Sequence, residues 1–238
     1  GQTLTNSIMT LAEGKIDISA MPIILPFLLE KGRGPFAKEG EKGAELAANL
    51  RGLYPYNAGA FMLFALDSEN IKSWDDLKGK TVFNGPPRGA ALVNARQSIV
   101  LASGLKEGDD YNGRQANWGQ LASILVDGSC DAFVLPGPFP SARVTTAQSA
   151  GDVTIVSTPK DIFEGEKYQK VFNAPGNIPI EVKWEDMGYG DGVSMISEDG
   201  VFRGLGTAFV ELVHKDMSFD LAKAITATHI SKLDMLKE

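Results

Sequence analysis

The sequence predicts an α/β protein made of two lobes. Segments with the pattern of strands and segments with the pattern of helices alternate along the whole chain, which is typical of parallel sheets. Two apolar stretches, residues 60–66 and 193–196, are separated by about half of the chain, and a self-contained series of strands and helices lies between them. A domain inserted into another domain through two strands would give this pattern. We therefore expect lobe I to comprise residues 1–58 and 197–238, and lobe II to comprise residues 59–196.

The composition is that of an ordinary globular protein with a sizeable core. Hydrophobic residues make up 43% of the 238 residues and charged residues 22%, which excludes a disordered chain, a collagen and a coiled coil. The longest apolar runs, residues 21–29 and 60–66, are much shorter than the ~20 residues that span a bilayer. The formal net charge is -7 and the basic residues are scattered, so we expect no nucleic-acid partner.

The predicted strands are short and rich in apolar residues. Residues 60–66 are apolar throughout, which indicates a strand buried on both faces. Residues 15–20 alternate between apolar and polar side chains, which is the pattern of a half-buried strand. The segments expected to be extended are 15–20, 47–54, 60–66, 80–84, 130–135, 153–156, 178–184 and 193–196.

Helices are expected where apolar residues recur every three or four positions. Gly14 and Gly104 are natural stops for two of them, because glycine readily adopts the conformation that ends a helix. Ser197, followed by two acidic residues, is expected to start a long helix that ends near residue 215. The expected helical segments are 4–14, parts of 22–46, 90–103, 117–126, 141–150, a helix from 158, 197–215 and 218–238.

No catalytic motif is complete. The tripeptide GKT at 79–81 resembles the end of a phosphate-binding P-loop, but Trp74 stands where the first glycine is required. His214 and His229 are the only histidines, and their spacing matches no metal-binding pair. Cys130 is the only cysteine, which excludes an internal disulfide and a cysteine-based zinc site. We therefore expect no catalytic residues, no metal and no cofactor.

Two predicted helix starts offer hydrogen-bond donors to an anion. The segment NGPPRG at 84–89 follows a strand and precedes a helix, and its two prolines stiffen the loop. Gly89 lets a ligand approach the backbone, and the N–H groups of Gly89 and Ala90 are free at the helix start. Arg88 adds a bidentate donor suited to carboxylate or phosphate.

The second helix start, at the N-terminus, carries donor side chains on Thr3, Thr5 and Asn6. Ligands of open α/β sheets bind at the carboxyl ends of strands, where such loops lie. One helix start in each lobe indicates a small anion held in a cleft. The alternative is that Arg88 is a solvated loop residue and that the N-terminal residues only cap a helix. Aromatic residues near predicted strand ends could wall the cleft, although each taken singly is more often core packing: Tyr54, Tyr56, Trp118 and Phe139.

A series of segments carries a family resemblance. In chain order they are TLTN with LAEGKID (3–17), LRGLYP (50–55), IKSWDDLKGKTV (71–82), NGPPRG (84–89) and LVDGSCDA (125–132). The series resembles the TAXI-type solute receptors of tripartite ATP-independent periplasmic (TRAP) transporters, and the likeness extends to about residue 208. The piece DLKGK alone occurs in many type II binding proteins, so the order of the segments carries the resemblance.

The resemblance implies a type II periplasmic-binding-protein-like fold, in which two α/β lobes joined by hinge strands close on a ligand. It implies a periplasmic receptor, not an enzyme, that captures a small organic acid or amino acid (glutamate-like, or a 2-oxo acid or dicarboxylate). The expected partners are this small anionic ligand and the membrane permease subunits of a TRAP transporter. Arg88 and its neighbours stand where the family usually has Ser or Thr, which makes Arg88 the expected anion partner. The family's first strand and helix should precede Gly1, so lobe I is expected to be incomplete there.

One alternative function stays open. An enzyme or a sensory ligand-binding domain could use the same fold, as in relatives that make or bind a pyrimidine precursor. The lack of histidine and cysteine clusters argues against the enzyme. A structural or protein-interaction module fits poorly with two anion-binding helix starts.

Overall fold

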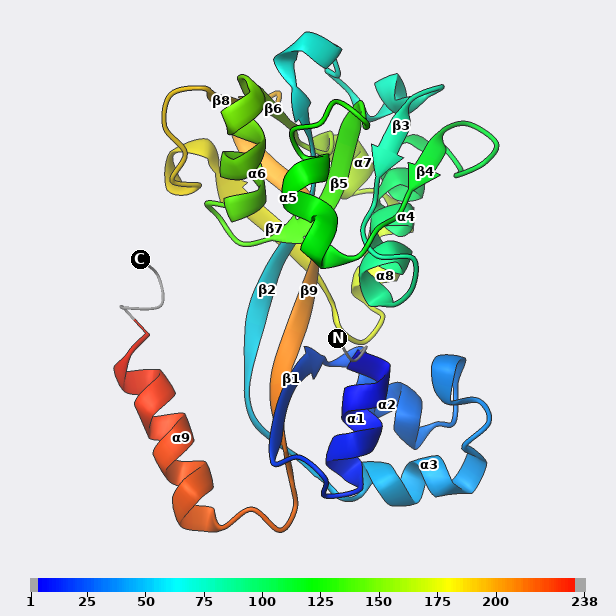
Figure 1. Cartoon of the computed structure of the whole chain (residues 1–238), viewed down its shortest axis with the longest axis vertical. Helices are drawn as coiled ribbons and strands as arrows, with labels where there is room; N and C mark the ends of the chain where they lie inside the picture. The colour runs from blue at the N-terminus through cyan, green and yellow to red at the C-terminus, as the bar shows by residue number, and fades with distance from the viewer. Residues whose placement is uncertain (1–3, 234–238) are drawn as a thin grey trace. The chain divides into compact units, whose positions relative to one another are not determined.

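The computed structural model describes residues 4–233, which form a mixed α/β fold (Figure 1). The chain divides into two compact units, one of residues 1–57 with 208–238 and one of residues 58–207. Two long strands, β2 (Leu50–Leu66) and β9 (Val201–His214), each contribute residues to both units. The lobe boundary expected after residue 196 falls before β9, whereas the chain passes from one unit to the other within this strand.

The larger unit, residues 58–207, contains a sheet in which most strands run in the same direction. β3, β4 and β5 pair in parallel, and so do β6 and β8. β2 is antiparallel to both β5 and β6, so the carboxyl ends of all five parallel strands lie at the same edge. These strands are β3 (Thr81–Phe83), β4 (Asn112–Arg114), β5 (Ala132–Gly137), β6 (Val153–Val156) and β8 (Val193–Ile196).

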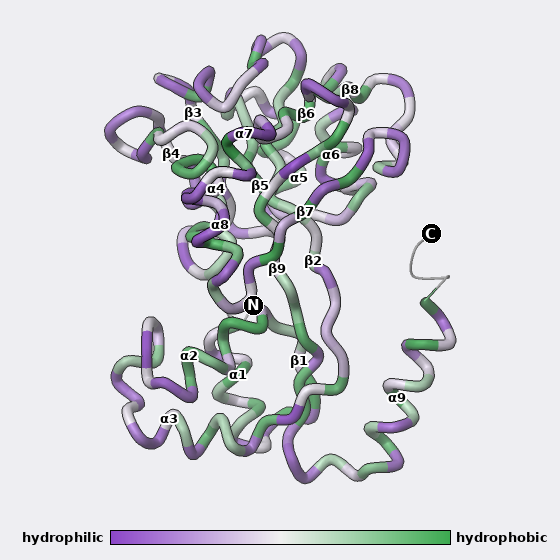
Figure 2. Tube along the Cα trace, turned by 180° about the vertical axis from the view of Figure 1, so that it is seen from behind, coloured by the Kyte–Doolittle hydropathy of each residue, from purple (hydrophilic) through white to green (hydrophobic). Residues whose placement is uncertain are grey.

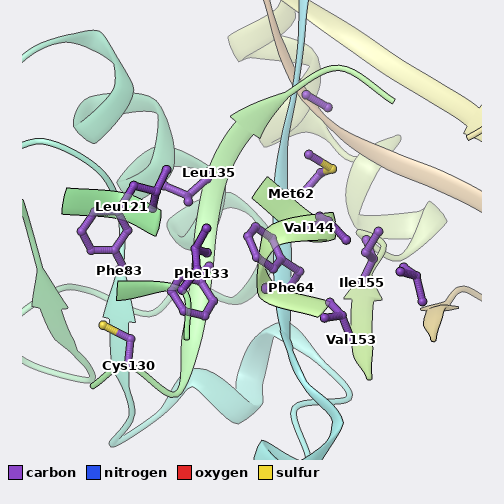
Figure 3. Packing of buried hydrophobic residues seen from close by; sticks show 14 of the residues in the cluster. Met62, Phe64, Phe83, Leu121, Cys130, Phe133, Leu135, Val144, Val153 and Ile155 are labelled. Carbon is purple, nitrogen blue, oxygen red and sulfur yellow. The ribbon is translucent and has the colours of Figure 1, made fainter. Parts of the chain in front are cut away.

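Two hydrophobic clusters cover the two faces of β2 in the larger unit. Met62 and Phe64 belong to one cluster, and Phe61 and Leu63 belong to the other, because successive side chains of a strand point to opposite faces. Figure 3 shows Phe64 beside Phe133, and their rings are stacked with centroids 5.2 Å apart. The prediction of a strand buried on both faces is therefore confirmed for residues 60–65.

The helices of the larger unit follow its strands along the chain. α4 (Ala90–Ser103) is the longest, and it ends at Gly104, whose φ of 80° is left-handed as the sequence predicts. The other helices are α5 (Leu121–Ile124), α6 (Ala142–Ala147), α7 (Lys160–Phe163) and α8 (Glu166–Phe172). The helix expected over residues 117–126 is thus reduced to one 3₁₀ turn and the short α5.

The smaller unit packs helices against a short antiparallel sheet. β1 pairs with β9 in the register Ile18 to Val213 through Pro22 to Phe209. Its core contains side chains from α1 and β1, such as Leu11 and Met21. The helices are α1 (Leu4–Ala12), α2 (Ile24–Glu30), α3 (Gly40–Ala47) and α9 (Phe219–Ser231), and β1 is Ile18–Pro22. Figure 2 shows hydrophobic and hydrophilic residues alternating along α9, and none of the described residues of α9 is buried.

The helix predicted over residues 197–215 is wrong, because residues 201–214 form β9. This strand pairs along its first half with β7 (Asn177–Lys183), from Val201 opposite Lys183 to Thr207 opposite Asn177. Gly204 and Gly206 explain the difference, since a Cβ on Gly206 would overlap the Ile180 side chain of β7. Glycine disfavours a helix and here permits close packing between strands. Similarly, the strands predicted at 47–54 and 60–66 are one continuous strand, β2.

Candidate functional site

The candidate site lies at the carboxyl edge of the parallel strands in the larger unit. The loop of residues 84–89 leads from β3 to α4, residues 115–117 lead from β4 to a 3₁₀ turn (Trp118–Gln120), and residues 138–141 lead from β5 to α6. Because β3 pairs in parallel with both β4 and β5, these three loops leave the same edge of the sheet. Ligands of open α/β sheets bind at such an edge.

The first turn of α4 offers backbone donors. Gly89 precedes the helix with a φ of 99°, and no side chain among the described residues caps this helix start. The N–H groups that begin a helix are unpaired and carry the positive end of the helix dipole. The helix expected to begin at residue 90 is present, and the binding role of Gly89 and Ala90 stays a prediction. Arg88 is exposed and makes no ion pair with the described residues.

Arg143, the second residue of α6, lies over the ring of Trp118. Its Cζ is 4.5 Å from the ring centroid. Trp118 in turn lies against the loop of residues 84–89, because a Cβ built on Gly85 would be 3.6 Å from Cη2 of Trp118. The same built Cβ would be 3.8 Å from the Cβ of Ala91, in the first turn of α4. The Trp118 side chain is nevertheless 40% exposed. The structure thus joins three loops through one aromatic ring, beside the first turn of α4.

The charge of Arg143 is not neutralised within the described part of the chain. The side chain is half-buried, and burial lowers the pKa of its guanidinium. No carboxylate of residues 4–233 lies within ion-pair distance of it, whereas Arg96 and Arg203 each have acidic partners. A partly desolvated cation held over an aromatic face is a suitable partner for a carboxylate or another oxyanion.

A buried polar network fixes the loop that carries the glycines. Asn84 is fully buried, and its Nδ2 donates to Glu107 Oε2 at 2.6 Å. Gln115 Nε2 donates to Asn84 Oδ1 at 2.8 Å, and Arg96 Nε donates to Glu107 Oε2 at 2.8 Å. The hydrogen bond from Arg96, together with those from Asn84 and Gln115, lowers the pKa of the Glu107 carboxyl. The network therefore ties the loops after β3 and β4 to each other.

The residues predicted from the N-terminal helix start lie in the smaller unit. Thr3 is outside the described residues. Thr5 and Asn6 are in the first turn of α1, Thr5 half-buried and Asn6 exposed. The backbone carbonyl of Asn6 accepts a hydrogen bond of 2.8 Å from Thr10 Oγ1. The binding role of Thr5 and Asn6 stays a prediction.

The predicted aromatic residues are divided between three places. Tyr54 and Tyr56 are in the part of β2 that belongs to the smaller unit, and Tyr54 stacks on His229 with ring centroids 3.9 Å apart. Phe139 is half-buried and packs edge-on against the buried Phe202 at 5.1 Å. Among the predicted aromatic residues, the structure places Trp118 beside the glycine loop.

Sequence reasoning missed Arg143, Asn84 and Glu107. One signal could have pointed to Arg143, because it follows the GPFP loop (137–140) at the carboxyl end of a buried strand, where a helix begins. Among the described residues, no group of three His, Cys, Asp or Glu side chains is placed to hold a metal ion. No helix in the described part of the chain is both long and apolar enough to cross a membrane.

The comparisons with solved structures give distant similarities. The periplasmic aliphatic sulphonate binding protein SsuA from Escherichia coli is 19% identical, with a TM-score of 0.42, over 63% of this chain and 45% of SsuA. A TRAP periplasmic solute binding protein from Xanthobacter autotrophicus Py2 with bound β-D-galacturonate is 14% identical, with a TM-score of 0.48, over 98% of this chain and 68% of that protein. A TRAP periplasmic solute binding protein from Desulfovibrio salexigens with bound orotic acid is 12% identical, with a TM-score of 0.46, over 93% of this chain and 60% of that protein.

The chain therefore spans less than half of the length of SsuA. A comparison of the sequence with protein families gives a more extensive match, to the NMT1-like family over residues 5–238. This match covers both units of the structure, including β2 and β9 and the three loops of the candidate site. On this ground, the protein belongs to the NMT1-like family.

Proposed function

We propose that this protein is the extracytoplasmic solute-binding receptor of a TAXI-type TRAP transporter. It would capture a small organic acid in the periplasm and deliver it to the membrane permease without converting it. Two findings support this proposal: the membership of the NMT1-like family and the ordered series of receptor-like segments in the sequence. The observation that carries it is Arg143, a half-buried guanidinium without a carboxylate partner among the described residues.

The proposed binding mode uses groups that are already in place. The ligand carboxylate accepts two N–H bonds from the Arg143 guanidinium, which presents a planar fork of donors. The first-turn N–H groups of α4, at Gly89 and Ala90, add backbone donors at the positive end of the helix dipole. Trp118 holds Arg143 in position and offers its exposed area to the apolar part of the ligand. Donors fixed before binding reduce the entropy that is lost on association.

Arg88 is the second cation proposed for the site. It precedes Gly89 in the loop and is exposed, so it would add to the positive potential without being desolvated. Thr5, Asn6, Tyr54 and Tyr56 belong to the other unit, and their part in binding remains a proposal from the sequence.

A thermal-shift screen with small acids tests the proposal. Amino acids, 2-oxo acids, dicarboxylates and neutral sugars are added singly, and hits are measured by calorimetry together with an assay for product formation. An acid present at 100 times its dissociation constant should stabilise the protein by about 2.7 kcal/mol. Binding of an acid without product formation supports a receptor.

The variant Arg143→Gln makes the test specific. It keeps a polar side chain, although a shorter one, and removes the charge, so affinity for the acid should fall at least about tenfold. Arg33→Gln is the matched control, because Arg33 is an exposed arginine of the smaller unit. Turnover of a hit would contradict the proposal, as would an affinity that Arg143→Gln leaves unchanged.

A further inference from the structure

Arg143 lies in the first turn of α6, a helix of 6 residues. A helix of this length is not stable alone, so contacts with the rest of the chain must set its position. The position of the Arg143 guanidinium over Trp118 therefore depends on what holds the start of α6. The residue at this start is Ser141, which is 1% exposed.

Ser141 uses its polar atoms to hold the first turn of α6. Its Oγ accepts a hydrogen bond of 3.3 Å from the backbone N–H of Arg143 itself, and its carbonyl oxygen accepts one of 3.1 Å from the N–H of Thr145. The N–H of Ser141 also needs an acceptor, because a buried N–H without one is costly in free energy. Tyr189 provides it, since the hydroxyl oxygen of Tyr189 accepts from the Ser141 N–H at 2.9 Å.

The segment that carries Tyr189 contacts α6 at both ends. Tyr189 binds at the start, and the carbonyl oxygen of Asp191 accepts a 2.6 Å hydrogen bond from Nε2 of Gln148, the first residue after the helix. The residues that these two bonds join are 48 and 43 positions apart in the sequence. A part of the chain that is distant in sequence therefore fixes the helix that carries Arg143.

Tyr189 is itself held in place and carries no charge. Its ring stacks on Trp184, with centroids 5.9 Å apart and planes at 21°. Its hydroxyl lies 4.0 Å from Sδ of the buried Met62. Burial raises the pKa of Tyr189 to about 12, so the hydroxyl is neutral at physiological pH. Tyr189 therefore supports α6 without a negative charge that would compete with a ligand carboxylate for Arg143.

We propose that Tyr189 is a positioning residue for Arg143. By accepting the N–H of Ser141, it holds the first turn of α6 so that the Arg143 guanidinium stays over Trp118. Tyr189 acts through the helix and is not assigned a contact with the acid. The inference rests on the proposed function, which makes Arg143 the partner of a carboxylate, but the position of Arg143 can be measured without any acid.

The first test therefore uses the protein alone. Because Cζ of Arg143 is 4.5 Å from the centroid of the Trp118 ring, the ring current should shift the Nε–H proton of Arg143 upfield in the NMR spectrum. Arg143→Gln removes this signal and so assigns it. Tyr189→Phe keeps the aromatic ring and removes the acceptor, so the signal should move towards its position in a solvated arginine. An Arg143 signal that stays in place in Tyr189→Phe would overturn the proposal.

Tyr168→Phe is the matched control. Tyr168 is a buried tyrosine of α8 whose hydroxyl lies 3.3 Å from Thr158 Oγ1, so this variant also loses a hydroxyl contact. It should leave the Arg143 signal unmoved, because α8 does not support α6 in this way. An equal movement in both variants would mean that a general loss of stability, and not the bond to Ser141, displaces Arg143, which would contradict the proposal.

The second test measures binding with sodium acetate, the simplest carboxylate, at constant ionic strength. Acetate should move the Arg143 and Trp118 side-chain signals of the wild type, and Tyr189→Phe should weaken its affinity about 2- to 5-fold. An affinity in Tyr189→Phe equal to that of the wild type would overturn the proposal. If acetate moves neither signal in the wild type, the acid site itself is contradicted, and the spectra without acetate still decide the role of Tyr189.

Discussion

The side chain of Asn84 donates a 2.6 Å hydrogen bond to the Glu107 carboxylate. Asn84 is the first residue after β3, and Glu107 precedes β4, so the bond connects the loop of the candidate site to the segment after α4. Arg96 and Gln115 donate to the same carboxylate, at 2.8 Å from Nε and 3.2 Å from Nε2 respectively. One acidic side chain thus organises the backbone on which the proposed anion site is built.

This arrangement predicts a pH-dependent contribution of Glu107 to stability. The pKa of Glu107 is lowered in the folded protein, first by the hydrogen bond from Arg96. The charged carboxylate is therefore more stable in the folded than in the unfolded state. The stabilisation is therefore present above the ordinary pKa of 4.5 and is lost as the pH falls through the lower, folded value. Glu107→Gln should lower the free energy of unfolding by about 1–3 kcal/mol at pH 7.

Urea titrations across the acidic range measure this difference. The gap between wild type and Glu107→Gln should shrink steadily below pH 4.5. Glu166→Gln serves as control, since Glu166 is exposed and lies in α8. If the free energies of unfolding of wild type and Glu107→Gln differ by the same amount at every pH, Glu107 does not act through its charge.

The two arginines of the acid site should differ in their effect on affinity. Arg143 is half-buried over Trp118, whereas Arg88 is exposed and its charge is solvated and screened. Arg143→Gln should weaken acid binding at least about tenfold, and Arg88→Ala should weaken it only about 2- to 3-fold. Calorimetry at low and high salt checks this prediction, because the Arg88 effect should fade with salt. A larger loss in Arg88→Ala than in Arg143→Gln would identify Arg88 as the direct anion partner.

Variants of Trp118 and Phe139 should distinguish an effect on acid binding from an effect on stability. Trp118 is 40% exposed, so Trp118→Ala should lower stability by less than about 1 kcal/mol while it weakens acid binding several-fold. Phe139 packs against Phe202, so Phe139→Ala should lower stability by about 2–3 kcal/mol. Chemical unfolding and calorimetry on the same two proteins give both quantities. Equal stability losses in the two variants would mean that Trp118 belongs to the core.

Gly59 allows the backbones of β2 and β5 to approach each other closely. It has a φ of 96°, and an added Cβ would overlap the carbonyl oxygen of Gly137. Gly59→Ala should therefore lower the free energy of unfolding by more than about 3 kcal/mol. Gly79→Ala is the matched control: Gly79 has a φ of 76° but no atom within 4 Å of a built Cβ, so only a loss of about 1–2 kcal/mol is expected. Thermal unfolding compares them, and equal losses would contradict the steric argument.

The sequence predicts those elements whose pattern is local. Residues 153–156 and 193–196 are short apolar runs and form β6 and β8, and Gly104 ends α4 as its sequence position indicates. β9 could not be predicted in this way, because it is stabilised by pairing with β7, which lies in a separate segment, and its small residues fit either pattern. The same holds for the site. The strand–glycine–helix order reveals Gly89, but no local pattern shows that Trp118 from another loop lies beneath Arg143.

The pairing of β1 with β9 has a consequence for the order of events during folding. Ile18 pairs with Val213, so the sheet of the smaller unit joins segments that lie before and after the larger unit in the sequence, and it cannot form on the ribosome before β9 has been synthesised. The larger unit is continuous in sequence and needs no such wait. Once it has folded, the two chain segments that leave it are held together, which lowers the entropy that β1 and β9 lose on pairing. The protein is therefore expected to assemble from its middle outwards, with amide protection in β5 and β6 appearing before protection in β1.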